Sequence, residues 1–391
     1  MRKVILVALM IHLNGCITQF IPKTNEDKKI LVVEGLITDQ PDADTIKLSK
    51  SLPLGAKIFA NPVTGGAVTI SDNLGNSYDL TEVKAGIYVT DPAGFRGVIG
   101  LHYTLHINAN VAGNNHNYES YPMEIKPVPP IDSVYYEKVT LQGINTTGNE
   151  EGCQIYLNTH DPTKQNKFYR WEYSETWEFR LPYDPVTNRQ CWLSKNSEVI
   201  NIKNTSTLEE DKINRYPLTF ISNQTDRLNV KYSILVNQYS MNEDEYLYWE
   251  KLQNISQQVG GLYDMVPSSV PSNIFCIDDP NEKVLGYFSV SARSSKRIFI
   301  KDHFSGLVNL YTACFGDTVF NGDPIPNLNT FAWIVETGEL HPITFINVVG
   351  VGVLEIVQPP VPFVIITYTE GCADCTLRGT KTEPAFWNEN K

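Results

Sequence analysis

Residues 168–180 read FYRWEYSETWEFR and form the clearest strand pattern in the chain. Successive side chains of a strand point to opposite faces, so one face of this segment would be largely aromatic and the other largely polar or charged. This alternation indicates a long strand within a sheet. It predicts a mainly β protein, and the segments on either side support the same prediction.

Short strand signals alternate with turn signals over residues 29–126. Turn sequences such as NPVTGG at 61–66 and NLGN at 73–76 separate the strand-like runs. This spacing predicts an N-terminal immunoglobulin-like β-sandwich over 29–126. The prolines of PVPP at 127–130 restrict the backbone and remove hydrogen-bond donors, so they predict a stiff linker. We therefore expect a second, larger strand-rich domain over 131–391.

The second domain contains one prominent amphipathic helix pattern. Ser240 and Glu243 have the spacing of a capping box, and the acidic residues at 243–245 suit the positive end of a helix dipole. The glycine pair at 260–261 would end the helix. An apolar stripe at helical spacing lies between these signals: Tyr248, Leu252, Ile255 and Val259.

Residues 1–16 read MRKVILVALMIHLNGC and have the order of a bacterial lipoprotein signal. Two basic residues precede an apolar run that is too short to span a bilayer, and a glycine then comes directly before Cys16. We expect a signal peptide over 1–15, lipid on Cys16 and a polar tether over 16–28. An ordinary secretory signal and a buried N-terminal strand are the alternatives.

The chain is acidic, with 44 Asp and Glu residues against 32 Lys and Arg residues and a formal net charge of −12. Without a basic block, this charge disfavours binding to nucleic acid and to anionic lipid headgroups. The hydrophobic content of 42% is ordinary for a globular protein, so extensive disorder is not expected.

Six cysteines follow Cys16, an even number that makes disulfides plausible outside the cytoplasm. Fifteen pairings are open to six cysteines, and the sequence does not choose among them. The motif CADC at 372–375 lacks the βαβ setting of a redox CxxC, and it has no second ligand pair for zinc. We expect it to staple the C-terminal segment. The disulfide candidates are Cys153, Cys191, Cys276, Cys314, Cys372 and Cys375.

The aromatic face of 168–180 is the best candidate for ligand binding. Aromatic rings offer large rigid contact areas to sugars and peptides, and a carboxylate among them would accept hydrogen bonds from hydroxyls or amines. The alternative is that this face belongs to a sandwich core, with Glu175 at an edge or paired with an arginine. The candidate ligand-binding residues are Tyr169, Trp171, Tyr173, Glu175 and Trp177.

The sequence contains no GxSxG, HExxH or Walker-type motif. Paired carboxylates could in principle hydrolyse a glycosidic bond, but that chemistry depends on a separation across a cleft that spacing along the chain does not reveal. We therefore predict no catalytic residue, no metal site and no cofactor, and we leave enzymatic activity open.

Eight motifs occur in order along the chain: LVVEGLITD at 31–39, PVPPIDS at 127–133, YRWE at 169–172, ETWE at 175–178, LGYFS at 285–289, KRIFI at 296–300, CADC at 372–375 and PAFW at 384–387. Together they resemble the Bacteroidota lipoproteins grouped as domain of unknown function 4249. The resemblance covers nearly the whole chain. It implies an outer-membrane lipoprotein, often encoded beside a TonB-dependent receptor, and it brings no catalytic residues. It does not say which leaflet the protein occupies.

Three functions agree with these observations. The first is a lipid-anchored, non-enzymatic outer-membrane protein that assists a TonB-dependent transporter by binding its substrate or the β-barrel itself. The second is a lipid-anchored hydrolase of glycans or peptides. The third is a structural or adhesive surface protein. None of them involves nucleic acid.

If the protein folds outside the cytoplasm, we expect few of the six cysteines after Cys16 to be free, because an oxidising compartment favours disulfides. Mass mapping of alkylated native protein would measure this directly. Six free thiols would contradict the extracytoplasmic assignment.

Overall fold

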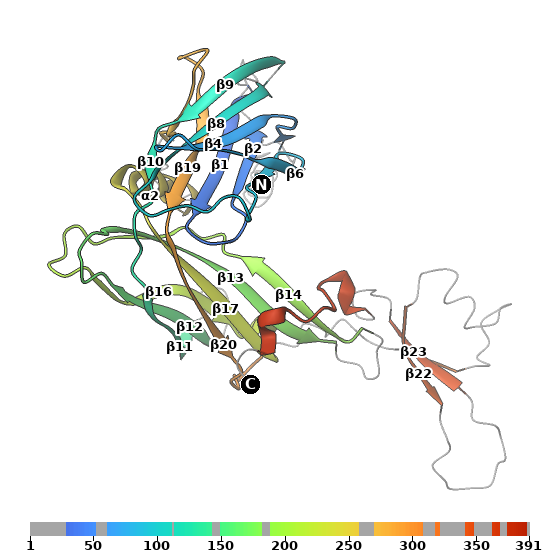
Figure 1. Ribbon diagram of the computed structural model, residues 1–391. Coiled ribbons are helices and arrows are strands. Elements are labelled where there is room, and N and C mark those ends of the chain that lie inside the picture. The colour runs from blue at the N-terminus through green and yellow to red at the C-terminus, as the bar shows by residue number, and fades with distance from the viewer. Residues whose placement is uncertain are drawn as a thin grey trace, which may run out of the picture. The chain divides into compact units, whose positions relative to one another are not determined.

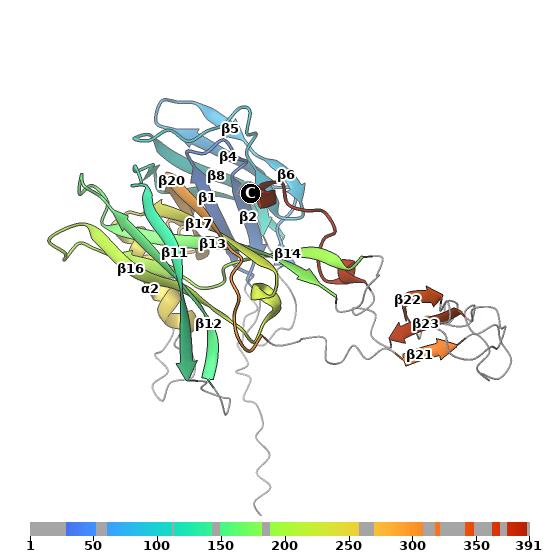
Figure 2. The same ribbon diagram turned by 90° about the horizontal axis from the view of Figure 1, so that it is seen from below.

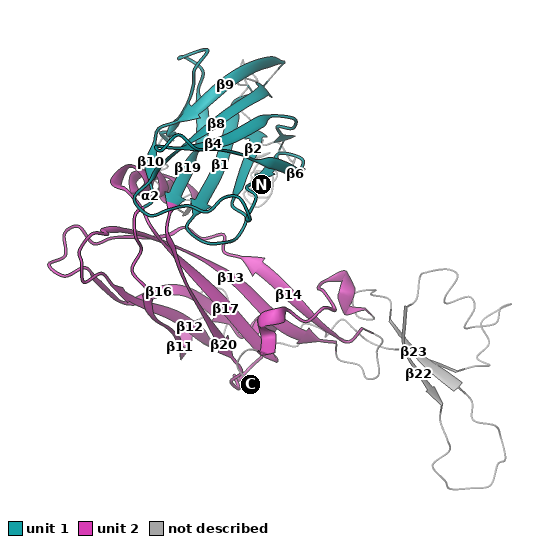
Figure 3. Cartoon of the chain, viewed as in Figure 1, with its two compact units in different colours: residues 1–125, 265–290 teal, residues 126–264, 291–391 magenta. Residues whose placement is uncertain are grey.

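The fold was obtained as a computed structural model. It describes residues 29–51, 61–111, 113–142, 149–181, 188–257, 270–307, 317–320, 341–347, 362–367 and 374–388. The predicted signal peptide, Cys16 and the tether lie outside these residues. The chain divides into two compact units (Figure 3): unit 1 comprises Met1–Ile125 and Met265–Val290, and unit 2 comprises Lys126–Asp264 and Ser291–Lys391.

Unit 1 is a β-sandwich of two six-stranded sheets (Figure 1). Sheet A has the order β19-β1-β2-β7-β6, with β3 paired to β2. Its strands are β1 (Leu31–Thr38), β2 (Thr45–Lys50), β3 (Asn61–Pro62), β6 (Thr81–Lys84), β7 (Ile87–Val89) and β19 (Val284–Ser291). Sheet B has the order β18-β9-β8-β4-β5, with β10 paired to β8. Its strands are β4 (Ala67–Asp72), β5 (Ser77–Asp79), β8 (His102–Val111), β9 (Asn114–Ser120), β10 (Met123–Glu124) and β18 (Ile274–Cys276).

The core of unit 1 follows from alternation along its strands. In β8, Tyr103, Leu105 and Ile107 are buried, whereas the residues between them are partly or fully exposed. Because one face of each sheet packs inward and the other meets solvent, an alternating sequence is the one that such a sandwich requires. The predicted mainly β fold with an N-terminal sandwich is confirmed.

Two strands of unit 1 come from far along the chain. Strands β18 and β19 form the edges of sheets B and A, and in Figure 1 the orange β19 lies beside the blue β1. The sequence placed residues 274–290 in a second domain that ran without interruption from 131. Strand pairing instead places them in unit 1, because short strand signals do not reveal which distant strand they will join.

Unit 2 contains two larger sheets. Sheet C has the order β11-β12-β16, and sheet D has the order β14-β13-β17-β20, with β15 paired to β13 (Figure 2). The strands are β11 (Ile131–Gln142), β12 (Asn149–His160), β13 (Phe168–Arg180), β14 (Gln190–Asn196), β15 (Asn201–Asn204), β16 (Lys212–Ser222), β17 (Lys231–Ser240) and β20 (Arg293–Ile300). A third sheet has the order β21-β23-β22 and consists of β21 (Asp317–Phe320), β22 (His341–Asn347) and β23 (Pro362–Thr367).

Sheets C and D share one hydrophobic core. It joins Ile155 and Leu157 of β12 to Trp171 of β13 and Val236 of β17. Strand β13 lies inside sheet D and pairs with β17 on one side and with β14 and β15 on the other. The segment FYRWEYSETWEFR therefore forms the strand that its length and pattern predict, and this strand lies in the interior of sheet D.

The predicted helix forms as α2 (Glu243–Gln257) and contacts strands β13 and β15. Its first turn is capped by Asn242, whose Oδ1 accepts a hydrogen bond from the Glu245 N–H at 2.7 Å, rather than by Ser240. Among the described residues, no helix combines the length and the apolar character needed to cross a membrane. Three 3₁₀ turns complete the described elements: η1 (Asp226–Leu228), η3 (Cys375–Leu377) and η4 (Ala385–Asn388).

Gly286 controls how closely β19 approaches β1. Its φ is +91°, and a Cβ at this position would collide with the backbone carbonyl of Val33. We expect Gly286→Ala to lower the free energy of unfolding of unit 1 by about 2–4 kcal/mol, because the substitution combines backbone strain with a clash that no side-chain rotation relieves. Urea denaturation followed by a unit 1 probe would measure this loss.

Gly75 supplies the matched control. Its φ of +90° imposes the same kind of strain, but open space surrounds the position of its Cβ. Gly75→Ala should therefore cost about 1 kcal/mol. Equal losses in the two variants would show that the close approach of β19 to β1 is unimportant.

Candidate functional site

The predicted ligand-binding row lies in the core of unit 2 and not at a surface. Trp171 donates a hydrogen bond from Nε1 to Gln238 Oε1 at 2.8 Å inside this core. The exposed fractions of the five candidates range from 0 to 5%. The ligand-binding prediction is therefore corrected, and the alternative of a sandwich core face describes the structure. The five residues are Tyr169, Trp171, Tyr173, Glu175 and Trp177.

Glu175 is the charged member of this buried row. Arg227 Nη1 lies 3.0 Å from Glu175 Oε2, and the arginine comes from η1. Burial raises the pKa of the Glu175 carboxyl, and the charge of Arg227 opposes that rise. The sequence predicted that Glu175 would be at an edge or paired with an arginine, and it is paired. In the structure, Glu175 is a core carboxylate whose charge is compensated by Arg227.

The six disulfide candidates differ in their bonding state. Cys191 of β14 and Cys375 of η3 are bonded. Cys153 and Cys276 are free thiols, and each is buried. Cys314 and Cys372 lie outside the described residues. Because Cys375 is bonded to a residue 184 positions away, it cannot pair with Cys372 at the same time, so the CxxC does not form a redox dithiol in this structure.

The disulfide ties the C-terminal segment to sheet D. Arg378 Nη2 lies 2.6 Å from Asp226 Oδ2, which adds an ion pair close to the disulfide. Trp387 is buried, with its ring edge-on to Trp192 of β14. The predicted stapling of this segment is therefore observed through Cys375, with the partner that the sequence left open.

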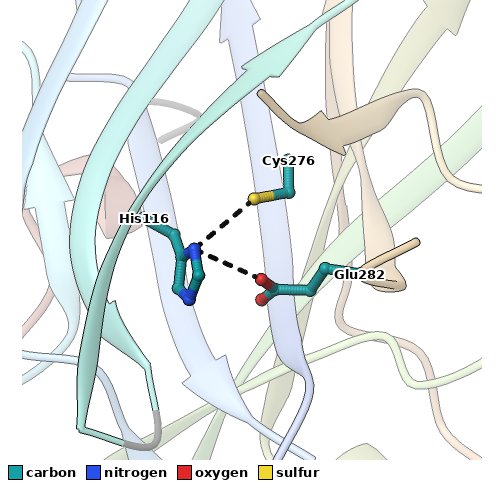
Figure 4. Close-up of side chains that lie close together, drawn as sticks. All are labelled: His116, Cys276 and Glu282. Atoms are coloured by element: carbon teal, nitrogen blue, oxygen red, sulfur yellow. Dashed lines mark hydrogen bonds and ion pairs between the residues drawn. The ribbon is translucent and has the colours of Figure 1, made fainter. Parts of the chain in front are cut away.

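A cluster of three potential metal ligands lies in unit 1 (Figure 4). His116 belongs to β9, Cys276 ends β18, and Glu282 lies in the segment between β18 and β19. His116 Nδ1 is 3.8 Å from Cys276 Sγ and 3.6 Å from Glu282 Oε2. The cysteine is buried, whereas the side chains of His116 and Glu282 are 21% and 20% exposed. The cluster is therefore accessible from solvent on one side.

Neighbouring groups hold the cluster in place. The Tyr118 hydroxyl donates a hydrogen bond to Glu282 Oε1 at 2.6 Å, which leaves Oε2 facing His116. Burial and this hydrogen bond raise the pKa of Tyr118. Burial also raises the pKa of the Cys276 thiol, and the neighbouring backbone N–H groups of Asp279 and Asp278 oppose that rise.

Sequence reasoning predicted no metal site and missed this cluster. His116 and Cys276 are 160 residues apart, and neither belongs to a ligand-spacing motif. They come together because β18 pairs with β9, with Cys276 opposite Tyr118 in the register. Since side chains alternate along β9, His116 and Tyr118 share the inner face on which Cys276 also lies. No pattern in the sequence predicts the pairing of β18 with β9.

The outer face of sheet B carries rows of polar residues. Ser71 Oγ lies 2.8 Å from His106 Nε2, and His106 Nδ1 lies 3.3 Å from Glu119. In the next row, Asn108 donates to Asn117 at 2.7 Å. A shallow hollow of about 230 Å³ opens on this face. It is lined by Ala67, Thr69, His106, Ile107, Asn108, Asn117, Tyr118 and Ile277.

An exposed apolar patch borders the hollow along the edge strand β18. Phe275 stacks at a tilt on Tyr121, with ring centroids 5.2 Å apart, and Ile277 follows two residues later. The exposed fractions are 60% for Tyr121, 36% for Phe275 and 51% for Ile277. We refer to these three residues as the β18 patch. Grouped exposed apolar side chains at a sheet edge are typical of a surface that contacts another molecule.

Comparison with known proteins identifies one family. A family model described as a domain of unknown function (DUF4249) matches residues 17–297. This range includes all of unit 1 that the structure describes and the central strands of unit 2. Among curated proteins, none matches the chain.

The buried ion pair of unit 2 yields a test of its role in stability. We expect Arg227→Met to lower the free energy of unfolding by about 2–3 kcal/mol at pH 8, because it leaves the Glu175 carboxylate buried without its cation. The loss should shrink towards pH 5. Burial raises the pKa of Glu175 in the folded protein. The contribution of Glu175 to the free energy of unfolding is therefore fully present below its unfolded-state pKa. It is lost as the pH rises through the folded-state pKa and the buried carboxyl ionises. Urea denaturation at both pH values measures this difference.

Arg215→Met is the control for this experiment. Arg215 pairs with Glu137, but their side chains are 56% and 39% exposed. Its removal should cost less than about 1 kcal/mol, with little change between the two pH values. A loss in Arg227→Met that did not depend on pH would contradict the role given to Glu175.

Proposed function

The chain belongs to the DUF4249 family, and on that premise we propose that it is a lipid-anchored extracytoplasmic protein that works by binding a partner protein. The partner in this proposal is a TonB-dependent outer-membrane transporter. The anchor is lipid on Cys16, and the bound molecule is either the β-barrel itself or a substrate presented to it.

The compartment is supported by the disulfide between Cys191 and Cys375. Disulfides persist in oxidising compartments and are rare in the cytosol, where thiols are kept reduced. The order of basic residues, short apolar run and cysteine at residues 1–16 supports the same compartment and adds the means of attachment. Both leaflets of the outer membrane remain compatible with this proposal.

Binding to a protein surface is supported above all by the β18 patch. Clusters of exposed aromatic and aliphatic side chains with polar neighbours are typical of protein-interaction sites. The adjoining hollow of about 230 Å³ is smaller than the roughly 300–1,000 Å³ of clefts that enclose drug-sized ligands. A shallow polar face beside an apolar edge suits contact with another macromolecule better than enclosure of a small one.

The transporter as partner rests on the resemblance of the sequence and on the anchor. A lipid-anchored protein is held within reach of integral outer-membrane proteins, which raises its effective concentration beside them. Weak surface contacts then suffice for a stable complex. This is the reason to expect a patch of modest size and not an extensive apolar interface.

The test is co-purification from native membranes with substitutions in the β18 patch. We expect the protein to retain a β-barrel partner, and Phe275→Glu with Ile277→Glu to reduce the retained partner at least tenfold, because a charge in the apolar centre of an interface carries an uncompensated desolvation cost. Quantitative mass spectrometry of the purified complex measures the ratio.

Leu74→Glu with Val83→Glu is the matched control. Leu74 and Val83 are 69% and 61% exposed, so this double variant adds the same two charges at other exposed apolar positions of unit 1. This variant should retain the partner. Recovery of the unsubstituted protein without any β-barrel would overturn the proposal, and equal loss from both variants would remove the β18 patch as the contact.

A further inference from the structure

The cluster of His116, Cys276 and Glu282 lies where the chain passes from one sheet of unit 1 to the other. Strand β18 is the edge of sheet B and β19 is the edge of sheet A, and Glu282 lies on the segment that joins them. The three donors therefore meet at one corner of the sandwich, on its inner side. Their convergence depends on unit 1 alone and is independent of the partner-binding proposal.

We infer that His116, Cys276 and Glu282 bind a divalent transition-metal ion of the zinc type. The imidazole would supply Nδ1, the thiol would supply Sγ as a thiolate, and the carboxylate would supply Oε2. The fourth position of a tetrahedral ion faces the open side of the cluster, where a water molecule or an external ligand would complete the coordination.

The distances between the donor atoms fit this assignment. An ion with metal–ligand bonds of about 2.0–2.3 Å in tetrahedral geometry separates its donors by about 3.3–3.8 Å. The Nδ1–Sγ distance is 3.8 Å and the Nδ1–Oε2 distance is 3.6 Å, and all three donor atoms lie within 4.8 Å of one another. Only small side-chain adjustments would then bring the donors onto one ion.

The chemistry of the donors selects the class of ion. A thiolate beside an imidazole favours zinc and related borderline or soft ions, whereas calcium and magnesium prefer oxygen ligands alone. Among the residues that the structure describes, these three side chains form the only group of three potential metal ligands that lie within metal-binding reach of one another. Comparable carboxylate–histidine contacts, such as His106 with Glu119, have no thiol beside them.

Neighbouring groups form hydrogen bonds that orient the proposed ligands, as the outer shell of a metal site does. Tyr118 holds the distal oxygen of Glu282 at 2.6 Å and so orients the carboxylate. Asp278 is fixed as well, because its carboxylate accepts the Asn117 N–H at 2.6 Å. Such outer contacts orient ligands and tune metal affinity.

A metal at this site would stabilise the short edge strand β18. Strand β18 has three residues and pairs with β9 on one side, so few main-chain hydrogen bonds hold it. A metal that joins His116 of β9 to Cys276 of β18 and to Glu282 would tie this returning segment to sheet B. Because the ligands are distant in sequence, the metal would stabilise the folded unit against opening.

The experiment uses the full mature chain, stripped of metal but with the Cys191–Cys375 disulfide intact, and zinc and cobalt(II) are the probes. We expect one equivalent of zinc to bind and to raise the melting temperature of unit 1. Cobalt in the same site should show a sulfur-to-cobalt charge-transfer band and the visible bands of tetrahedral coordination. Absence of stoichiometric binding, or cobalt binding without a sulfur band, would overturn the inference.

Variants separate this site from other metal contacts. Cys276→Ser should abolish the charge-transfer band, and Tyr118→Phe should weaken zinc binding by about 10–100-fold with the band retained. Cys153→Ser, which removes the other free thiol among the described residues, and Glu119→Gln should leave both band and affinity unchanged. A charge-transfer band that survives Cys276→Ser would refute the assignment. If Cys276→Ser fails to fold, Glu282→Gln provides a second ligand test, and it should weaken zinc binding.

Discussion

The pairing of β19 with β1 is the constraint on which unit 1 depends. Residues before 126 provide most of both sheets, but the edges are completed by a segment that returns after more than a hundred residues of unit 2. An edge left open would expose unpaired main-chain groups and the apolar side chains beneath it. Gly286 makes the close approach possible, and Phe288 enters the core beside it. Unit 1 is therefore complete only when both passages of the chain are present, which makes its contacts unusually non-local.

The same return creates the chemistry of unit 1. It brings Cys276 and Glu282 to His116 on the inner side of the sandwich corner. It also places Phe275 on the outer side of β18 and the exposed Ile277 directly after that strand. Because side chains alternate along a strand, Cys276 of β18 faces the proposed metal site, whereas Phe275 faces the proposed contact surface. The two proposals therefore concern opposite faces of the chain around β18, and they are tested by substitutions at different residues.

Unit 2 is organised around the aromatic strand β13. Its position between β17 and the pair β14 and β15 buries a row of large rings, so it supplies much of the apolar surface that stabilises the two sheets. Glu175 is tolerated within that row because Arg227 compensates its charge. The disulfide of Cys375 then holds the C-terminal segment against the edge strand β14. The features that made this strand look like a ligand platform in the sequence are the features of a well-packed core.

The sequence by itself determined what is local. Alternation at 168–180 predicted strand β13, turn signals predicted the short strands of the sandwich, and helical spacing with acidic residues at 243–245 predicted α2, because period and turn chemistry are properties of neighbouring residues. Several segments together also identified the family. Tertiary structure alone decided that residues 274–290 belong to unit 1, that Cys375 bonds to Cys191, that the aromatic face is buried, and that His116 meets Cys276. Each of these depends on which distant strands pair and which faces pack together, and no local pattern carries that information.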